Sequence, residues 1–295
     1  PERIIVTPGS SGAFILTFTG LFDVGDTIGV GSPGYPSYRQ ILKALSLNNS
    51  TIKTFNNNKF QPVAADIINN SLDGLLVASP ANPTGSMLNK YDLEKLIDAC
   101  KMKQTVFISD EIYHGIEYES RAVSALEVSD DCIVINSFSK YFSMTGWRLG
   151  WIVVPKNHIR QFERLAQNMF ICAPHISQIA ALGALDASDE LNLNLKTYEA
   201  NRTILIEELP KLGLKNFAPP DGAFYCYIDV SEYTDDSVNF AKRVLDEVHV
   251  AITPGIDFDP ERGLKTIRLS YACSTSDLKE GLKRLEKFMS KYIIK

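Results

Sequence analysis

The chain has 295 residues, of which 45% are hydrophobic and 22% are charged, and its formal net charge is −5 at pH 7. This length and apolar content suffice for one large α/β domain or for a large and a small domain. The acidic balance argues against a protein that binds nucleic-acid backbones, because such proteins carry a basic face. No nucleic-acid partner is expected.

The sequence also contains neither a membrane-spanning run nor a secretion signal. No apolar stretch is long enough to cross a bilayer, and no basic segment followed by an apolar run stands near Pro1. The five cysteines are scattered and form no C-x-x-C pair, which favours buried thiols in a reducing cytosol over disulfides or a zinc site. We therefore expect a cytoplasmic protein without a metal centre.

Up to about residue 185, short β-branched runs alternate with helical periodicity. The runs are Ile4–Thr7, Thr27–Val30, Gly74–Ser79, Thr105–Ser109, Cys132–Asn136 and Leu149–Val154. Continuous apolar runs of this kind predict parallel strands that are buried on both faces. Between two of them, Asn89 is a candidate N-cap for a helix whose apolar residues run from Leu93 to Cys100. Ligands are then expected beyond the carboxyl ends of the strands.

The pattern changes after about residue 186. A long amphipathic stretch over Leu191–Leu209 is ended by Pro210 and Gly213. Strand signals follow at Ala223–Val230, Val250–Thr253 and Thr266–Ala272, and the C-terminus is helical from Ser276. We expect a large domain over residues 1–185 and a smaller α+β domain over residues 186–295.

The segment from Asn136 to Arg148 carries a pattern that suits the chemistry of pyridoxal 5′-phosphate (PLP). Ser137 and Ser139 precede Lys140, and Arg148 follows eight residues later, just after a predicted strand. PLP needs a lysine for its aldehyde, donors for its phosphate, and an acid that keeps its ring nitrogen protonated. Taken alone, S-x-x-K is more often a surface lysine on a turn, because short patterns recur by chance.

Several motifs in register resemble those of fold-type I PLP enzymes, the class I/II aminotransferases that include aspartate aminotransferase. They are VTPGSSGAF, SPGYPSY, SPANPTG, SDEIY, SFSK with MTGWRLG, DGAFY, PGIDF and IRLSYA, and they extend from Val6 to about Ala272. The resemblance implies an α/β fold whose large domain has a doubly wound, mostly parallel, seven-stranded sheet covered by helices. A smaller C-terminal α+β domain would complete it.

The resemblance assigns a role to each matching residue. Lys140 would form the Schiff base with PLP and carry the proton as general base and acid. Asp110 would pair with the ring nitrogen, and Tyr113 would donate to the phenolic oxygen. The other residues expected to bind the cofactor are Ser10, Ser11, Ser137 and Arg148 at the phosphate, Tyr35 against the ring and Asn82 at the phenolic oxygen. Arg268, with Asn82 beside it, would hold the substrate carboxylate through a guanidinium fork.

For several of these residues the sequence alone leaves a simpler explanation open. Tyr35 lies between prolines and could only pack, and Asn82 could only form a turn. Asp110 and Glu111 could cap a helix. The loop Thr7–Gly12 could be a tight turn, although its place between a strand and a helix suits phosphate binding.

In the family, roughly the first quarter of a chain precedes the strand at Arg3–Thr7. It supplies an N-terminal arm, an upstream part of the small domain and a tyrosine for the neighbouring subunit, and none of these is visible in this sequence. We expect a homodimer with shared active sites and a native chain that extends upstream of Pro1. No second arginine can be placed for a side-chain carboxylate, so a dicarboxylate substrate is not supported.

The function implied is transfer of an amino group from an L-amino acid to a 2-oxo acid. A PLP-dependent C–S β-lyase on the same fold is an alternative, because the cofactor motifs do not separate elimination from transamination. An aminotransferase-like sensor domain, detached from a DNA-binding N-terminus, is a third possibility.

Overall fold

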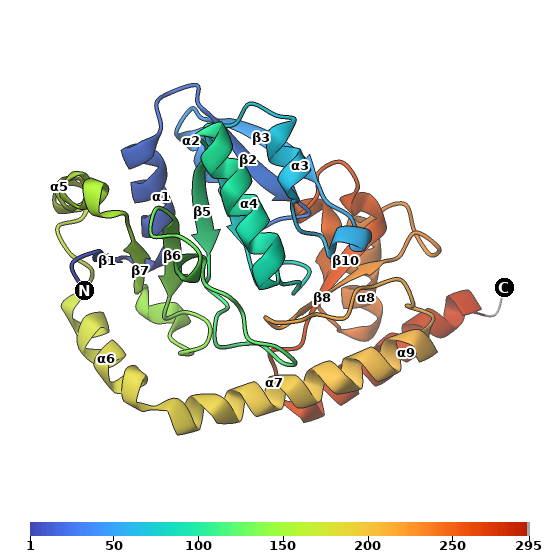
Figure 1. Cartoon of the computed structure of the whole chain (residues 1–295). Helices are drawn as coiled ribbons and strands as arrows, with labels where there is room; N and C mark the ends of the chain where they lie inside the picture. Colours follow the sequence, from blue (N-terminus) through green and yellow to red (C-terminus); the bar gives the residue numbers. More distant parts are fainter. Residues whose placement is uncertain (294–295) are drawn as a thin grey trace.

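A seven-stranded sheet forms the centre of the computed structural model, which describes residues 1–293 (Figure 1). Its strand order is β1-β7-β6-β5-β4-β2-β3, and β7 runs antiparallel to both of its neighbours while the remaining pairs are parallel. The strands are β1 (Ile4–Thr7), β2 (Thr27–Ser32), β3 (Asn48–Lys53), β4 (Gly74–Ala78), β5 (Val106–Asp110), β6 (Ile133–Ser137) and β7 (Gly150–Val153). The predicted mostly parallel, seven-stranded sheet is confirmed.

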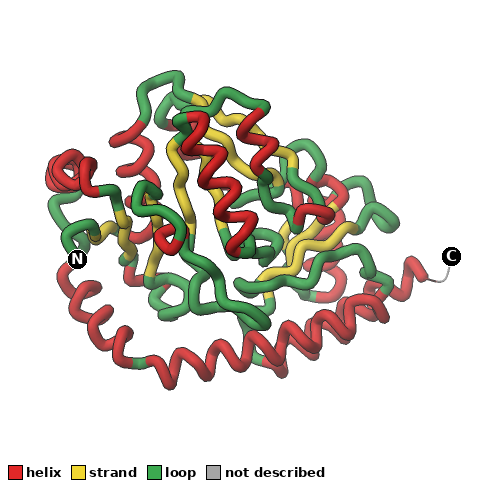
Figure 2. The backbone as a smooth tube through the Cα atoms, in the orientation of Figure 1, coloured by secondary structure: helices red, strands yellow, loops and turns green. Residues whose placement is uncertain are grey.

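Helices cover both faces of this sheet, as Figure 2 shows. One face packs against α1 (Gly9–Leu21), α2 (Pro36–Ala44) and α5 (Ile159–Met169), and the other against α3 (Ala64–Ile68) and α4 (Lys90–Lys103). The predicted N-cap of α4 is confirmed, since the Asn89 side chain accepts the Asp92 amide at 2.9 Å. That bond satisfies one of the free amides of the first turn.

A second, three-stranded antiparallel sheet of order β8-β10-β9 lies beside the first. It is formed by β8 (Tyr225–Asp229), β9 (Thr253–Pro254) and β10 (Thr266–Ser270). Its apolar face packs with α8 (Ser237–Val248), α9 (Thr275–Ile293) and the end of α7 (Ser188–Glu208) into a separate core. β8 begins two residues later than predicted, because Ala223 has a left-handed backbone with φ of 57°.

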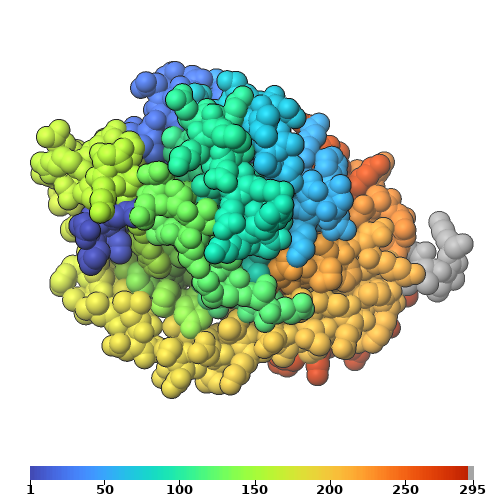
Figure 3. All heavy atoms as spheres, viewed as in Figure 1, coloured from blue at the N-terminus to red at the C-terminus, as the bar shows by residue number. Residues whose placement is uncertain are grey.

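Helices α6 (His175–Asp186) and α7 run along one side of the molecule, from near the N-terminus to the smaller sheet (Figures 1 and 2). In the space-filling view they form the lower rim of the visible face (Figure 3). Within residues 1–293, no helix combines the length and the apolar character that a membrane crossing requires.

Candidate active site

Residues from distant parts of the sequence meet at the carboxyl ends of the parallel strands. Asp110 is the last residue of β5, Ser137 is the last of β6, and Asn82 follows β4 by four residues. The loop after β1 leads into α1, whose first turn holds Ser10 and Ser11. Neighbouring parallel strands end at one edge of the sheet, so their polar ends form one site there.

Asp110 is a buried carboxyl group, with 3% of its surface exposed. No ion pair joins it to a cationic side chain in the part of the chain that the structure describes. Its two oxygens accept the hydroxyl of Tyr38 and, at 3.1 Å, the amide of Ile112. Burial raises the pKa of Asp110 to about 6, and the two donors oppose that rise. The position therefore favours a cationic partner.

Tyr38, which the sequence did not single out, is held in place by its ring. It packs edge-on against Phe14 of α1 at 5.2 Å and against Tyr35 at 5.4 Å. Burial and the neighbouring Asp110 raise the pKa of Tyr38 well above 10, so its phenol stays a donor to that carboxylate. Only its position in the sequence could have pointed to Tyr38: it lies three residues after Tyr35, on the first turn of α2.

Lys140 lies in the loop after β6 and is half-buried. Its Nζ atom lies 5.6 Å from the ring centre of Tyr113 and 5.8 Å from that of Phe224. Burial, followed by the charge of Arg268, lowers the pKa of the Lys140 amine, whereas Asp110 acts against that change. A lysine with a lowered pKa is a better nucleophile and base at neutral pH.

Arg268 projects from β10 with its guanidinium between two aromatic rings. The distances from its Cζ atom to the ring centres are 4.2 Å for Tyr225 and 4.7 Å for Phe258. Its Nη1 donates to Asn82 Oδ1 at 2.9 Å, which joins the smaller sheet to the loop after β4. Its Nε is buried without a hydrogen-bond partner among the described residues. An unpaired buried donor of this kind suits a carboxylate ligand.

Arg148 reaches the loop that precedes α1. Its guanidinium lies so close to Gly9 that a Cβ atom there would come within 2.6 Å of Nη2, and Gly9 also has a φ of 71°. Arg148 is itself exposed and in the left-handed region, and its Nη1 donates to the Thr145 carbonyl at 3.0 Å. Ser10 is half-buried and Ser11 is exposed beside it. The Arg148 guanidinium, the two serine hydroxyls and the N-terminus of α1 together suit an anion.

Ser137 and Tyr35 differ in accessibility. Ser137 is buried, and its hydroxyl bonds to the Leu149 carbonyl and to Ser139 Oγ, both at 2.9 Å. Tyr35 is 38% exposed at the start of α2, and its ring packs edge-on against that of Tyr38. The structure thus brings the predicted residues to one end of the sheet. The Ser137 hydroxyl, however, already forms hydrogen bonds with Ser139 and Leu149.

Tyr113 is buried and donates its hydroxyl to that of Tyr225 at 3.1 Å. Tyr225 is the last residue of the DGAFY motif, from which no role for it was predicted. Nothing in the sequence pairs these two residues, because they are 112 positions apart.

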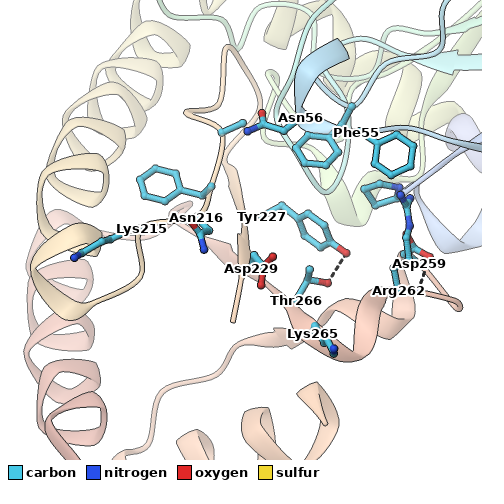
Figure 4. Close-up of a pocket in the computed structure, with 14 residues that line it drawn as sticks. Phe55, Asn56, Lys215, Asn216, Tyr227, Asp229, Asp259, Arg262, Lys265 and Thr266 are labelled. Atoms are coloured by element: carbon cyan, nitrogen blue, oxygen red, sulfur yellow. Dashed lines mark hydrogen bonds and ion pairs between the residues drawn. The ribbon is translucent and has the colours of Figure 1, made fainter. Parts of the chain in front are cut away.

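A separate cavity of about 480 Å³ opens between the loop after β3 and the smaller sheet (Figure 4). Phe55 and Asn56 lie on one side, Lys215 and Asn216 on another, and Tyr227 in the centre. None of the predicted site residues lines it. One of its lining residues, Tyr227, pairs with Arg268 in the register of β8 and β10.

Comparison with known proteins identifies the chain. Residues 1–285 match the family described as aminotransferase class I and II. The chain belongs to this family. It is therefore an aminotransferase with the aspartate aminotransferase fold, and its cofactor is PLP.

The relatives of this aminotransferase include curated enzymes. It is 43% identical over 291 residues to the valine–pyruvate aminotransferase of Mycobacterium tuberculosis, which covers 97% of the chain and 75% of that enzyme. An aspartate aminotransferase of Thermotoga maritima is 34% identical, with 98% of the chain and 76% of the enzyme covered.

Crystal structures agree closely with this aminotransferase. A protein from Silicibacter pomeroyi is 60% identical with a TM-score of 0.97, covering 99% of the chain and 79% of that protein. An aminotransferase from Mycobacterium tuberculosis is 42% identical with a TM-score of 0.96, covering 99% of the chain and 77% of the other.

The residues present fit PLP. Among the described residues, the buried carboxylate of Asp110 forms no ion pair, as a site for a protonated ring nitrogen requires. The close approach of Arg148 to Gly9 forms an anion site at the start of α1. Lys140 lies near enough to Asp110 and Arg148 for both charges to act on its amine, whose pKa is lowered mainly by burial.

Proposed function

We propose that this aminotransferase transfers the amino group of a neutral L-amino acid to a small 2-oxo acid, with Lys140 as the cofactor lysine. The main support is the position of Lys140. Its amine is half-buried, and the charges of Asp110, Arg148 and Arg268 all act on its pKa. The 43% identity to a valine–pyruvate aminotransferase supports the choice of substrates.

Two other arginines near the smaller sheet have partners of their own, which supports a neutral side chain on the substrate. Arg39 donates to the carbonyls of Asp257 and Phe258, and Arg262 pairs with Asp259 at 2.7 Å. Neither offers a free fork for a second carboxylate. Arg268 therefore binds the one carboxylate that every α-amino acid carries.

Each end of PLP meets its own set of residues in this proposal. Ser10, Ser11 and Arg148 would hold the phosphate, and the Ser137 hydroxyl would join them by turning away from Leu149. Tyr35 would cover one face of the ring. The Asn82 amide and the Tyr113 hydroxyl would both donate to the phenolic oxygen. Asp110, kept ionised by Tyr38, would hold the proton on the ring nitrogen.

PLP supplies the electron sink that makes the α-proton of a bound amino acid acidic. The Lys140 amine would accept that proton from Cα and deliver it to C4′ of the cofactor, and its lowered pKa suits a group that acts first as base and then as acid. Arg268 fixes the substrate carboxylate through Nε and one Nη, which orients the Cα–H bond toward Lys140. Asn82 steadies the same guanidinium from the other side.

A panel of amino acids tests this function. The enzyme with PLP should form more than one equivalent of 2-oxo acid from neutral amino acids only when a 2-oxo acid such as pyruvate is added to accept the amino group. Aspartate should react at least tenfold more slowly. A C–S β-lyase would instead release ammonia without any acceptor, and that result would contradict the proposal.

We also infer two domains and a homodimer. The two sheets with separate cores support a division into residues 1–185 and 186–295. An exposed apolar stripe on α6 supports self-association, because contiguous apolar patches on a protein surface often mark interfaces. It consists of Ile176, Ile179, Leu182 and Leu185, each at least half exposed, with Ile171 beside it. A partner copy that covers this stripe would lie near Trp147, close to Arg148.

A reducing compartment such as the cytoplasm also belongs to this proposal. All five cysteines are free thiols, and Cys100, Cys132 and Cys226 are buried. Burial raises the pKa of the Cys100 and Cys132 thiols to about 12, which keeps them protonated and unreactive.

A further inference from the structure

We propose that Tyr225 is a positioning residue, whose hydroxyl strengthens Tyr113 as the hydrogen-bond donor to the phenolic oxygen of PLP. This inference rests on the proposed role of Tyr113 and adds a residue to it. In this proposal Tyr225 does not contact the cofactor. It acts through its hydrogen bond to Tyr113.

The two hydroxyls form an isolated pair. Tyr113 and Tyr225 are 4% and 7% exposed, their oxygens are 3.1 Å apart, and their rings are nearly perpendicular at 83°. Among residues 1–293, neither hydroxyl has another hydrogen-bond partner. A buried phenol without a partner is costly, so this bond is expected to persist when ligands bind.

The backbone before Tyr225 is hydrogen-bonded to the loops that follow β4 and β5 of the large sheet. The Gly222 amide donates to the Gly85 carbonyl at 2.8 Å, and the Ala223 amide donates to the Ile116 carbonyl at 2.9 Å. A Cβ atom on Gly222 would lie 2.7 Å from the Ile116 oxygen, so the contact requires glycine. Tyr225 thus belongs to the smaller sheet, but the backbone two residues before it is hydrogen-bonded to Ile116, close to Tyr113 in the sequence.

The ring and the hydroxyl of Tyr225 do different things. The ring packs against the Arg268 guanidinium at 4.2 Å, whereas the hydroxyl contacts Tyr113. Replacement by phenylalanine keeps the first contact and removes the second. The role of the hydroxyl can therefore be tested without disturbing the carboxylate site.

The direction of the bond gives the pair its effect. Burial raises the pKa of Tyr113 well above 10 and also raises that of Tyr225, so each phenol keeps its one proton at neutral pH. When Tyr113 donates its hydrogen bond to the phenolic oxygen of PLP, the Tyr225 hydroxyl turns and donates to the Tyr113 oxygen. Consecutive hydrogen bonds polarise one another, and each donor becomes stronger.

The pH titration of the visible absorption of the PLP-loaded enzyme, without substrate, reports this effect. The titrating group is the nitrogen that joins Lys140 to the cofactor. The phenolic oxygen carries more negative charge once this nitrogen has lost its proton, so a strong donor to the oxygen lowers the midpoint. Tyr225→Phe should raise the midpoint by about half a pH unit, roughly a threefold change in proton affinity. Tyr113→Phe should raise it by more than one unit.

The double variant and a control complete the experiment. Tyr225→Phe should add no shift in the Tyr113→Phe background. Tyr227→Phe is the matched control, since Tyr227 is buried on the same strand and its hydroxyl bonds to Thr266 Oγ1 at 2.6 Å. Its midpoint should equal that of the native enzyme.

Each outcome decides one question. If Tyr113→Phe shifts the midpoint and Tyr225→Phe does not, Tyr225 only packs and the inference is wrong. An equal shift from Tyr225→Phe with and without Tyr113 would also overturn it, because the effect would then bypass Tyr113. If Tyr113→Phe itself leaves the midpoint unchanged, the proposed role of Tyr113 fails, and the inference falls with it.

Discussion

Asp110→Asn should make the cofactor-free protein more stable at neutral pH. Burial raises the pKa of Asp110 from 3.8 to about 6 in the folded protein. Between these two values the unfolded chain has already released its proton while the folded protein still binds it. Raising the pH through this window therefore favours the unfolded state. Two pKa units correspond to about 3 kcal/mol of unfolding free energy, which the native protein loses between pH 4 and pH 7.

Denaturant unfolding of both cofactor-free proteins at several pH values measures this difference. The gap between Asp110→Asn and the native protein should widen by about 3 kcal/mol from pH 4 to pH 7. Asp259→Asn is the control: this buried carboxylate is paired with Arg262, and its loss should destabilise the protein at pH 7. Parallel stability curves for Asp110→Asn and the native protein would refute the reasoning.

The same substitution should have the opposite effect on function, because asparagine cannot hold a proton on the ring nitrogen. Turnover with PLP should fall by about a hundredfold or more. The Asp110 carboxylate would then destabilise the cofactor-free protein at neutral pH and yet be needed to bind the protonated ring nitrogen of PLP. Turnover within a few-fold of the native rate, with PLP still bound, would contradict this role of Asp110.

Three further predictions concern the lysine, the arginine and the helix surface. Lys140→Ala should abolish the visible absorption that borohydride reduction fixes in the native enzyme, while some PLP stays bound; an unchanged band after dialysis would exclude this lysine. Arg268→Lys should raise KM for amino acids about tenfold or more without changing PLP content, because an ammonium cannot form two parallel hydrogen bonds; equal reaction of simple amines in the native enzyme would argue against the clamp. Leu182→Glu on α6 should shift a dimer toward monomer in sedimentation, whereas Leu245→Glu, at an exposed leucine of α8, should not.

Much of the fold could be predicted because its strands are apolar runs buried on both faces. β3 was missed for the opposite reason: it is the polar edge strand Asn48–Lys53, mostly exposed, and joins the sheet by backbone pairing with β2. β9 was predicted at Val250–Thr253 but pairs only at Thr253 and Pro254. Edge strands carry little side-chain signal because only one flank is covered.

Motifs in the sequence predicted the candidate site residues, but they did not predict the residues that contact and support them. Tyr38 and Tyr225 act on Asp110 and Tyr113 through contacts 72 and 112 residues apart. Neither contact follows from spacing along the chain. The unpaired Nε of Arg268 likewise becomes evident only once its surroundings are known.

The order of strands in the large sheet has a consequence for synthesis on the ribosome. Among the described strands, β1 (Ile4–Thr7) pairs only with β7 (Gly150–Val153), so it finds its neighbour only after the intervening residues 8–149 have been synthesised. The contact between Asn82 and Arg268 closes later still, across 186 residues. A nascent chain therefore exposes an unpaired β-segment for many seconds at ordinary elongation rates. Chaperones that shield such segments would be needed most before β7 emerges.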